Sequence, residues 1–280
     1  QKATHSALVA VMRRNGELAQ DYAERHGVPK WYDDGAALIA DPNVDAISVA
    51  TPPNSHKEYA LMAAAAGKPV YVEKPMAMNH AECIDMVEAC REAGVPLFVA
   101  YYRRCLPRFV KIKELIDGGA IGDVRFVLTY LYQQARPDHF DADNLPWRVR
   151  PEIAGAGIFF DLAAHTLDYL DYFLGPITSV EGFAGSQAGR YPAEDTVAGS
   201  FVFESGAHGE GLWCFDAYKD EDITEIVGTD GKLSFSSFGE EPIRLETTNG
   251  MTEFDIKHPP HVQQPLIQTI VDELLGNGQC

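Results

Sequence analysis

The stretch Pro69-Val-Tyr-Val-Glu-Lys-Pro75 decides the fold of this chain. Its apolar run, Val70–Val72, predicts a buried strand, and a helical pattern follows from Asn79 to Ala93. Open α/β sheets bind ligands at the carboxyl ends of their strands, and Lys74 occupies such an end. The proline that follows biases Lys74 toward extended backbone. A lysine placed in this way is either a solvated strand-end residue or a site residue, and its neighbours favour a site.

Strand-like and helix-like segments alternate through the first half of the chain. Further strands are expected at 7–12, 45–50 and 96–100, and helices at 17–26 and 55–66. Gly27 and Gly67 follow the two helices, as glycines at helix ends commonly do. Continuous apolar strands separated by helices are typical of parallel sheets covered on both faces. The first half therefore predicts an α/β fold of the Rossmann type, with a doubly wound parallel sheet.

The second half shows a different pattern of predicted strands and helices. A helix is expected at 106–117, an alternating strand at 123–133 and an apolar helix at 157–174, with a Pro- and Asp-rich loop at 136–151. Later strands are expected at 179–187, 196–203, 207–215, 221–227 and 232–236, with Ser205-Gly206 and Asp230-Gly231 as tight turns. This pattern predicts an α+β domain with an open, mainly antiparallel sheet. We expect two domains, residues 1–118 and 119–280. Because the outer face of an open sheet needs a cover, we also expect a homodimer or homotetramer formed through it.

Charge and composition exclude several partners. The 280 residues include 23 basic and 41 acidic side chains, and the net charge of −18 disfavours nucleic acid. No apolar run approaches the ~18 residues that a membrane span needs. The five cysteines show neither a CxxC pair nor zinc-like spacing, so we expect no metal site and a reducing, cytoplasmic location.

The glycine-rich turn that normally opens a dinucleotide fold is missing. Such a fold begins with a strand and a turn such as GxGxxG. This chain begins at Gln1, and its first predicted strand resembles the second strand of a dinucleotide fold. We expect that the first strand and its glycine loop are absent from the chain. The alternative, that the fold binds no dinucleotide, stays open.

Two arginines, Arg13 and Arg14, follow the first predicted strand. In NAD-binding folds this position usually carries an acidic residue for the ribose hydroxyl, whereas arginine accommodates the 2′-phosphate of NADP. The pair therefore favours NADP, with NAD still possible. The alternative is an ordinary solvated pair in a loop.

The next strand ends in Thr51-Pro-Pro-Asn-Ser-His56. Amide groups at the start of a helix suit a phosphate or a ribose, so Thr51, Pro52, Asn54 and His56 are expected to contact the cofactor. The same turn is also compatible with a rigid, capped loop without a ligand.

A carboxylate and a histidine lie four residues apart within Gly155–His165. Asp161 and His165 share one face of the predicted helix, and Asp168 follows one turn later. A carboxylate that orients a histidine is a common way to build a general base. A surface pair or a satisfied buried histidine is the alternative. No third ligand is evident beside the pair, so a metal site is not expected.

Together these segments resemble the glucose–fructose oxidoreductase/inositol dehydrogenase family, also called GFO/IDH/MocA oxidoreductases. The resemblance covers nearly the whole chain. It is carried by residues 44–53 with His56, 66–75, Arg103-Arg104 with Pro107, 119–122, Trp147-Arg148, 155–165 and 226–233.

The resemblance implies a Rossmann domain followed by an α/β domain whose open sheet serves in dimers or tetramers. By this analogy Lys74 polarises the reacting oxygen and contacts the nicotinamide ribose, with Glu73 and Pro75 fixing it. His165 exchanges the substrate proton, and Asp161 holds the substrate or the histidine in place. The chain departs from the family by lacking the glycine fingerprint, and Gly155-Ala-Gly157 replaces the more usual triple glycine.

We therefore expect reversible hydride transfer between NADP(H) and a carbinol or carbonyl carbon of a sugar, polyol or related diol. Trp147 and Arg148 follow the Pro-rich loop and are expected to close over such a substrate. Two alternatives within the family remain. One is a glycosidase that oxidises the sugar transiently and regenerates its bound NAD, and the other is a catalytically silent ligand sensor.

Overall fold

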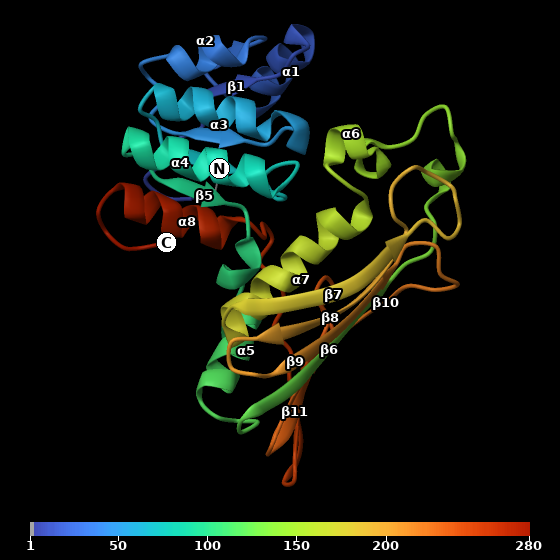
Figure 1. Cartoon of the computed structure of the whole chain (residues 1–280). Helices are drawn as coiled ribbons and strands as arrows, with labels where there is room; N and C mark the ends of the chain where they lie inside the picture. The colour runs from blue at the N-terminus through green and yellow to red at the C-terminus, as the bar shows by residue number, and fades with distance from the viewer. Residues whose placement is uncertain (1–2) are drawn as a thin grey trace. The chain divides into compact units, whose positions relative to one another are not determined.

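The computed structural model describes residues 3–280, which divide into two compact units. The first unit is the chain up to Ala100 together with Gln263–Cys280, and the second is Tyr101–Val262 (Figure 1). Each unit has a hydrophobic core of its own, as a domain requires.

The first unit alternates short parallel strands with helices. Its strands are β1 (Ala10–Met12), β2 (Lys30–Tyr32), β3 (Ile47–Val49), β4 (Val70–Val72) and β5 (Leu97–Val99). Its helices are α1 (Gly16–His26), α2 (Gly35–Ala40), α3 (His56–Ala65), α4 (His80–Ala93) and α8 (Gln264–Leu274). β1 pairs in parallel with β2, and β4 pairs in parallel with both β3 and β5. The Rossmann-type fold predicted for this half is confirmed, although β2 and α2 were not predicted.

Local sequence sets the ends of the helices in the first unit. Asn15 and Asn79 precede α1 and α4, and their side chains accept backbone N–H groups of the first helical turn. Gly27 and Gly94 end the same helices with φ angles of 64° and 66°, in the left-handed region that glycine adopts without strain. These caps fix where each strand-to-helix turn begins.

A cavity of about 370 Å³ lies along β1 and β3. Apolar side chains dominate its lining, among them Val9, Val11, Ile39, Ile47, Val49 and Tyr59. Among residues 3–280, β1 pairs with no strand except β2, and β3 pairs with none except β4. The expectation about a strand before β1 stays a prediction.

The second unit is built on an eight-stranded sheet with the order β13-β12-β11-β10-β6-β9-β8-β7. Its strands are β6 (Val124–Tyr132), β7 (Ile177–Gly185), β8 (Thr196–Phe203), β9 (His208–Cys214), β10 (Glu221–Gly228), β11 (Gly231–Phe235), β12 (Ile243–Thr247) and β13 (Gly250–Phe254). All neighbouring pairs are antiparallel except β6 and β9, which are parallel. The sheet is therefore mixed and mainly antiparallel, as predicted. The last two strands, each of five residues, were not predicted.

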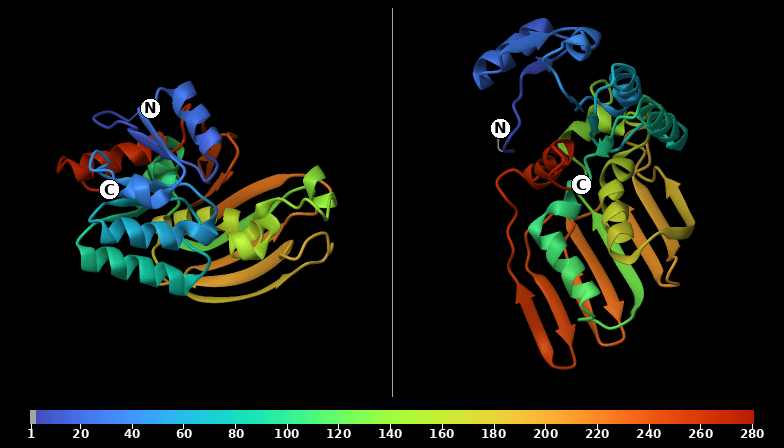
Figure 2. Two further views of the ribbon diagram at one scale, coloured as in Figure 1. Left: turned by 90° about the horizontal axis from the view of Figure 1, so that it is seen from above. Right: turned by 90° about the vertical axis from the view of Figure 1, so that its left-hand side faces the viewer.

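Helices cover one face of this sheet. The helices of the second unit are α5 (Pro107–Asp117), the single-turn α6 (Pro151–Ala154) and α7 (Ile158–Leu174). Figure 2 shows α5 and α7 along the same face. Phe109 of α5 and Tyr169 of α7 pack there with inward side chains of the strands, such as Phe201 and Leu233. No described helix of the second unit covers the opposite face.

Hydrogen-bonded polar side chains lie within this core. The Tyr169 hydroxyl is 2.8 Å from Thr224 Oγ1 and 2.7 Å from Ser237 Oγ. Thr224 Oγ1 lies 2.9 Å from Thr129 Oγ1. Burial raises the pKa of Tyr169 to about 12, so its phenol stays protonated at neutral pH. The cluster ties α7 to β6, to β10 and to the segment after β11.

The structure divides the chain at a different place from the predicted boundary at residue 118. Residues 101–118 lie in the second unit because Phe109 and Ile112 of α5 belong to its core. Gln263–Cys280, which includes α8, lies in the first unit. The amphipathic pattern of each helix indicates that it is covered, but not which of two sheets covers it.

Within the described part of the chain, every helix is too short or too polar to cross a membrane. Cys90 is buried in the core of the first unit, and Cys83 packs against the same cluster. Burial raises the pKa of both thiols, which therefore stay protonated at neutral pH. Both cysteines act as small hydrophobic residues.

Candidate functional site

The Glu-Lys-Pro turn follows β4 directly. The backbone N–H of Glu73 donates to the carbonyl oxygen of Val49 at 2.9 Å, which extends the pairing of β4 with β3 into the turn. One carboxylate oxygen of Glu73 accepts the backbone N–H of Lys74 at 3.2 Å. Lys74 is half-buried and Pro75 is buried. The turn thus holds Lys74 at the carboxyl end of a central strand, as predicted.

The buried ring of His56 connects this turn to the neighbouring one. Its Nε2 lies 2.7 Å from the carbonyl oxygen of Thr51, and its Nδ1 lies 3.0 Å from that of Pro75. Carbonyl oxygens only accept, so a neutral imidazole, which carries one N–H, donates to one of the two at a time. The ring is 1% exposed. His56 therefore faces backbone on both sides, and its predicted contact with a cofactor stays a prediction.

The turn after β3 offers polar groups at its surface. Asn54 is exposed, while Thr51 and Pro52 are half-buried. Ser55 directly precedes α3, but its side chain makes no capping bond to that helix. Its hydroxyl instead donates to Thr51 Oγ1 at 2.8 Å, and it is 3.1 Å from the Pro52 carbonyl oxygen. Asn54, Thr51 and Pro52 are the residues of this turn that a ligand could reach.

Arg13 and Arg14 lie directly after β1 and are both exposed. The backbone N–H of Arg13 donates to the carbonyl oxygen of Tyr32 at 3.2 Å, which fixes the end of the strand beside β2. The two guanidinium groups therefore extend from a rigid strand end. Such an arrangement suits an anionic group.

A distant glutamine reaches the Glu-Lys-Pro turn. The amide nitrogen of Gln263, the residue before α8, donates to the second carboxylate oxygen of Glu73 at 2.6 Å. The hydroxyl of Tyr71 donates to the amide oxygen of Gln263 at 3.1 Å. The separation of 190 residues between Gln263 and Glu73 gives no sequence signal for this contact, which was not predicted.

In the second unit, α7 carries both Asp161 and His165. The backbone N–H of Gly157, before the helix, donates to Glu194 Oε1 at 2.9 Å. A Cβ atom at Gly157 would lie only 2.7 Å from the carbonyl oxygen of Glu194, so glycine is required at this close approach. Asp161 is 8% exposed and His165 is 2% exposed, and they follow each other by one helical turn. The predicted pair therefore lies on one buried helix face.

Aromatic rings surround His165 within the second unit. The ring centres of Tyr102, Phe238 and Tyr101 lie 5.0, 6.1 and 6.4 Å from that of His165, each with edge-on geometry. Aromatic walls of this kind fix the plane of an imidazole and limit the access of water. None of the three aromatic residues was among the predicted site residues.

The segment that carries Phe238 is held by charged groups. The carboxylate of Asp222 accepts the backbone N–H groups of Ser237 and Phe238 at 3.1 and 2.7 Å and the hydroxyl of Ser236 at 2.6 Å. Arg103 Nε donates to the carbonyl oxygen of Ser237 at 2.9 Å, and its guanidinium lies 4.4 Å from the centre of the Phe238 ring. Contacts with Asp222 and Arg103 therefore fix the position of Phe238.

Trp147 and Arg148 lie beside Asp161. Arg148 Nε donates to Asp161 Oδ2 at 3.2 Å, and the Arg148 guanidinium lies 4.4 Å from the centre of the Trp147 indole. The Arg148 side chain is 48% exposed, whereas that of Asp161 is 11% exposed. The structure thus joins two residues predicted to contact substrate to a predicted catalytic carboxylate, and one guanidinium edge remains accessible.

Asp168 belongs to a different interaction. Its carboxylate accepts two bonds from Arg104, with Nε at 2.9 Å and Nη2 at 2.6 Å. Burial raises the pKa of Asp168, against the effect of this arginine. Asp168 therefore pairs with the segment before α5, and the structure gives it a structural role.

Matches with protein-family models cover most of the chain. Residues 1–101 match the model described as oxidoreductase family, NAD-binding Rossmann fold. Residues 109–234 match the GFO/IDH/MocA C-terminal domain.

Several characterised proteins are similar to this chain along its length. An oxidoreductase of Formosa agariphila is 38% identical, over 99% of this chain and 85% of that protein. The 1,5-anhydro-D-fructose reductase of Ensifer adhaerens is 32% identical, over 99% and 84% of the two chains. Mouse (Mus musculus) trans-1,2-dihydrobenzene-1,2-diol dehydrogenase is 32% identical, over 91% and 72%.

Solved structures share the fold. Levoglucosan dehydrogenase in complex with NADH and levoglucosan superposes with a TM-score of 0.86 at 24% identity, over 98% of this chain and 82% of that one. An NAD-binding oxidoreductase from Klebsiella pneumoniae gives a TM-score of 0.84 at 26% identity, over 97% and 81%. The chain belongs to the GFO/IDH/MocA family of NAD(P)-dependent oxidoreductases.

Proposed function

We propose that this protein catalyses reversible hydride transfer between NADP(H) and a carbinol or carbonyl carbon of a sugar, polyol or related diol. Relatives named as acting on such compounds include a 1,5-anhydro-D-fructose reductase, a levoglucosan dehydrogenase and two inositol dehydrogenases. The observation that carries the proposal is the arrangement on α7, where Arg148 bonds Asp161 one helical turn before the buried His165.

His165 is the proton-transfer group in this proposal. Oxidation of an alcohol requires that its hydroxyl proton leave as the carbon gives up hydride, and a neutral imidazole accepts such a proton. The rings of Tyr102 and Phe238 limit the positions that the imidazole can take, so its reactive nitrogen is oriented before substrate arrives. In the reverse direction the same nitrogen returns the proton to the developing alkoxide.

Lys74 stabilises the negative charge that develops on the reacting oxygen. A lysine ammonium is a compact cation with three donors, and such a donor acts most strongly where the surroundings are rigid. Glu73 and His56 hold the backbone on either side of Lys74 through the bonds described above.

The polar strand ends of the first unit fit a dinucleotide. When bound, the cofactor accepts or supplies the hydride at its nicotinamide ring. We assign Arg13 and Arg14 to the 2′-phosphate of NADP, and Thr51, Pro52, Asn54 and the Glu73–Pro75 turn to the rest of the cofactor. Three exposed or half-exposed turns at the ends of β1, β3 and β4 support this assignment.

Trp147 and Arg148 are assigned to the substrate. An indole face packs against the C–H surface of a sugar ring, and the free edge of a guanidinium donates to hydroxyl groups. Because Arg148 also holds Asp161, a substrate that reaches the guanidinium lies close to the catalytic helix.

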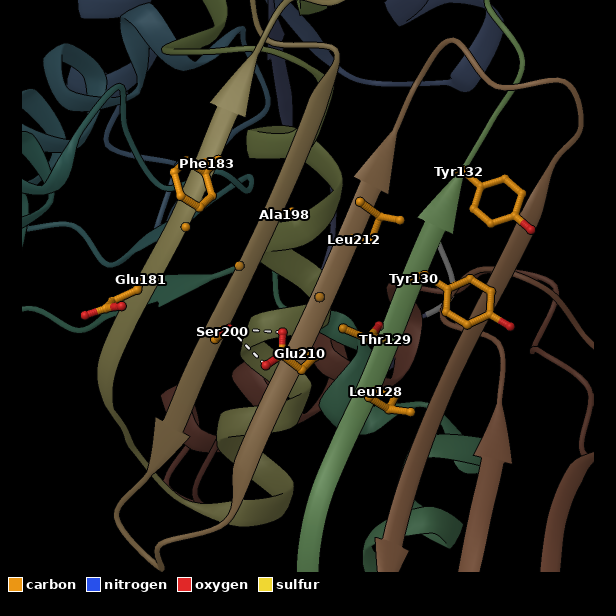
Figure 3. Close-up of a pocket in the computed structure, with 13 residues that line it drawn as sticks. Leu128, Thr129, Tyr130, Tyr132, Glu181, Phe183, Ala198, Ser200, Glu210 and Leu212 are labelled. Atoms are coloured by element: carbon orange, nitrogen blue, oxygen red, sulfur yellow. Dashed lines mark hydrogen bonds between the residues drawn. The ribbon is translucent and has the colours of Figure 1, made fainter.

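We further propose that the uncovered face of the large sheet pairs with a second copy of the chain. A hollow of about 960 Å³ lies on this face. Phe183, Leu212 and Leu128 are among its lining residues, which Figure 3 shows on the sheet. Phe183 is 85% exposed and Leu212 is 44% exposed. Exposed apolar patches of this kind typically mark protein interfaces, and a self-complementary face generates a closed dimer.

The first prediction concerns the catalytic lysine. Lys74→Met keeps the length of the side chain but removes the ammonium, so turnover should fall by about 100-fold or more. The measurement is the absorbance of NADPH with a panel of keto-sugars and keto-polyols. Lys57→Met, a lysine on α3 paired with Asp85, is the control. Turnover of Lys74→Met at the wild-type rate would contradict the proposed role.

The second prediction concerns cofactor choice. Arg13→Asp places a carboxylate where we assign the 2′-phosphate, so the KM for NADP should rise about tenfold or more while that for NAD does not rise. Arg91→Asp, an exposed arginine on α4, makes the same change of charge elsewhere. An unchanged KM for NADP in Arg13→Asp would exclude the assignment.

The third prediction concerns the Arg148–Asp161 pair. Arg148→Lys keeps the charge but loses the planar donor group, so kcat/KM for the substrate should fall about tenfold. Arg150→Lys alters an arginine of similar exposure that pairs with Glu152, and it should leave kcat/KM unchanged. Equal values for the two variants would rule out a role for Arg148 at the site.

The fourth prediction concerns assembly. Phe183→Glu places a charge on the exposed sheet face, so the mass measured by sedimentation should fall to that of the monomer if this face forms the dimer. Val87→Glu changes an exposed residue of α4 in the same way and should leave the mass unchanged. A monomeric wild-type protein would refute the assembly proposal.

A further inference from the structure

Gln263 occupies the start of the carboxyl-terminal helix but bonds to the Glu-Lys-Pro turn. It precedes α8, and its side chain makes no capping bond to that helix. Its amide instead connects Tyr71 of β4 with Glu73 immediately after β4. A residue at a helix start that does not cap its own helix is available for another role.

The contacts require both ends of a carboxamide. The nitrogen donates to a Glu73 carboxylate oxygen at 2.6 Å, and the oxygen accepts the Tyr71 hydroxyl at 3.1 Å. The bond to the carboxylate is charge-assisted and short, as such bonds are. A glutamate at position 263 would place two carboxylates together, and an apolar residue would leave the Glu73 oxygen without this donor. Glutamine meets both requirements.

The bond to Gln263 leads to Lys74 through Glu73. Glu73 Oε1 accepts the amide N–H of Gln263, and Glu73 Oε2 accepts the backbone N–H of Lys74. On the other side of Lys74, the ring of His56 bonds the carbonyl oxygen of Pro75. The backbone around Lys74 is therefore held from two directions, by one residue close in sequence and by one from the end of the chain.

The helix that follows Gln263, α8, is anchored within the first unit. Leu266 and Ile270 of α8 are buried, at 6% and 5% exposure. The amide oxygen of Gln268 accepts the backbone N–H of Thr4 at 2.7 Å, which ties the same helix to the start of the chain. A side chain carried by an anchored helix orients its partner more strictly than one carried by a mobile loop.

We propose that Gln263 is a positioning residue for Lys74, acting through the carboxylate of Glu73. The proposal rests on the role proposed above for Lys74. Loss of the Gln263 amide frees the Glu73 carboxylate and lets the Lys74 backbone shift. Because this displaces a group that acts in the transition state, kcat should fall while the KM values for cofactor and substrate change little.

The test compares Gln263→Met with Gln268→Met. The first variant keeps length and packing but removes the amide, and the second removes a glutamine amide of the same helix that bonds Thr4 and Asp272. We expect kcat to fall about tenfold in Gln263→Met and to stay at the wild-type value in Gln268→Met, with similar melting temperatures. Gln263→Glu should lose more activity than Gln263→Met, because its carboxylate repels that of Glu73.

A double-mutant cycle then tests the route through Glu73. In a Glu73→Ala background, Gln263→Met should have no further effect on kcat, because the carboxylate that it orients is gone. Additive losses, or a kcat in Gln263→Met equal to that of Gln268→Met, would overturn the inference. Failure of the proposed function would differ, since Lys74→Met would then retain wild-type turnover. An inactive Lys74→Met beside a fully active Gln263→Met would reject only the role of Gln263.

Discussion

The bridge made by the buried imidazole of His56 is the interaction on which the first unit's site depends. Parallel strands place their carboxyl ends at one edge of a sheet, but the turns that follow are free to diverge. His56 joins two of these turns through the carbonyl oxygens of Thr51 and Pro75. The strand ends thus form one surface, and Lys74 lies within the second of the two joined turns. Buried polar groups of this kind are costly unless satisfied, and each ring nitrogen of His56 lies within hydrogen-bond distance of a carbonyl oxygen.

The second unit obtains its rigidity in another way. Its predicted catalytic residues lie on α7, a helix packed on a wide sheet, and their surroundings come from distant segments. Glu194 holds the start of the helix, Arg148 bonds Asp161, and Phe238 flanks His165. Each of these residues is fixed by bonds to backbone or to a charged partner. The site residues are therefore presented by the scaffold with little freedom to rearrange.

Much of the fold could be predicted from the sequence, because its signals are local. The apolar run at 70–72, the glycine at 27 that ends α1 and the alternation in β6 each reflect a structure formed by neighbouring residues. The strands β12 and β13, at one end of the sheet, were missed because each has only five residues and gives a weak sequence signal. The boundary at residue 118 differed from the structure because a helix pattern does not identify the sheet that it covers.

The candidate site could be predicted only in part, for a similar reason. Strand-end and helical spacing, together with the family resemblance, predict Lys74, Asp161 and His165 as site residues. Gln263, Phe238 and Asp222 act across long sequence separations, and neither spacing nor residue type distinguishes them from ordinary surface residues. Contacts of this kind depend on the topology of the fold, which is difficult to predict from a single sequence.

The return of the last helix to the first unit has a consequence for how the protein forms. The second unit is continuous in sequence, whereas the first is assembled from two separated segments. During synthesis the chain emerges from its amino-terminal end, so the whole second unit leaves the ribosome before α8 is available. The first unit is thus completed last, and with it the contact that Gln263 makes beside Lys74. A nascent chain from which α8 has not yet emerged would therefore hold Lys74 without the contact between Gln263 and Glu73.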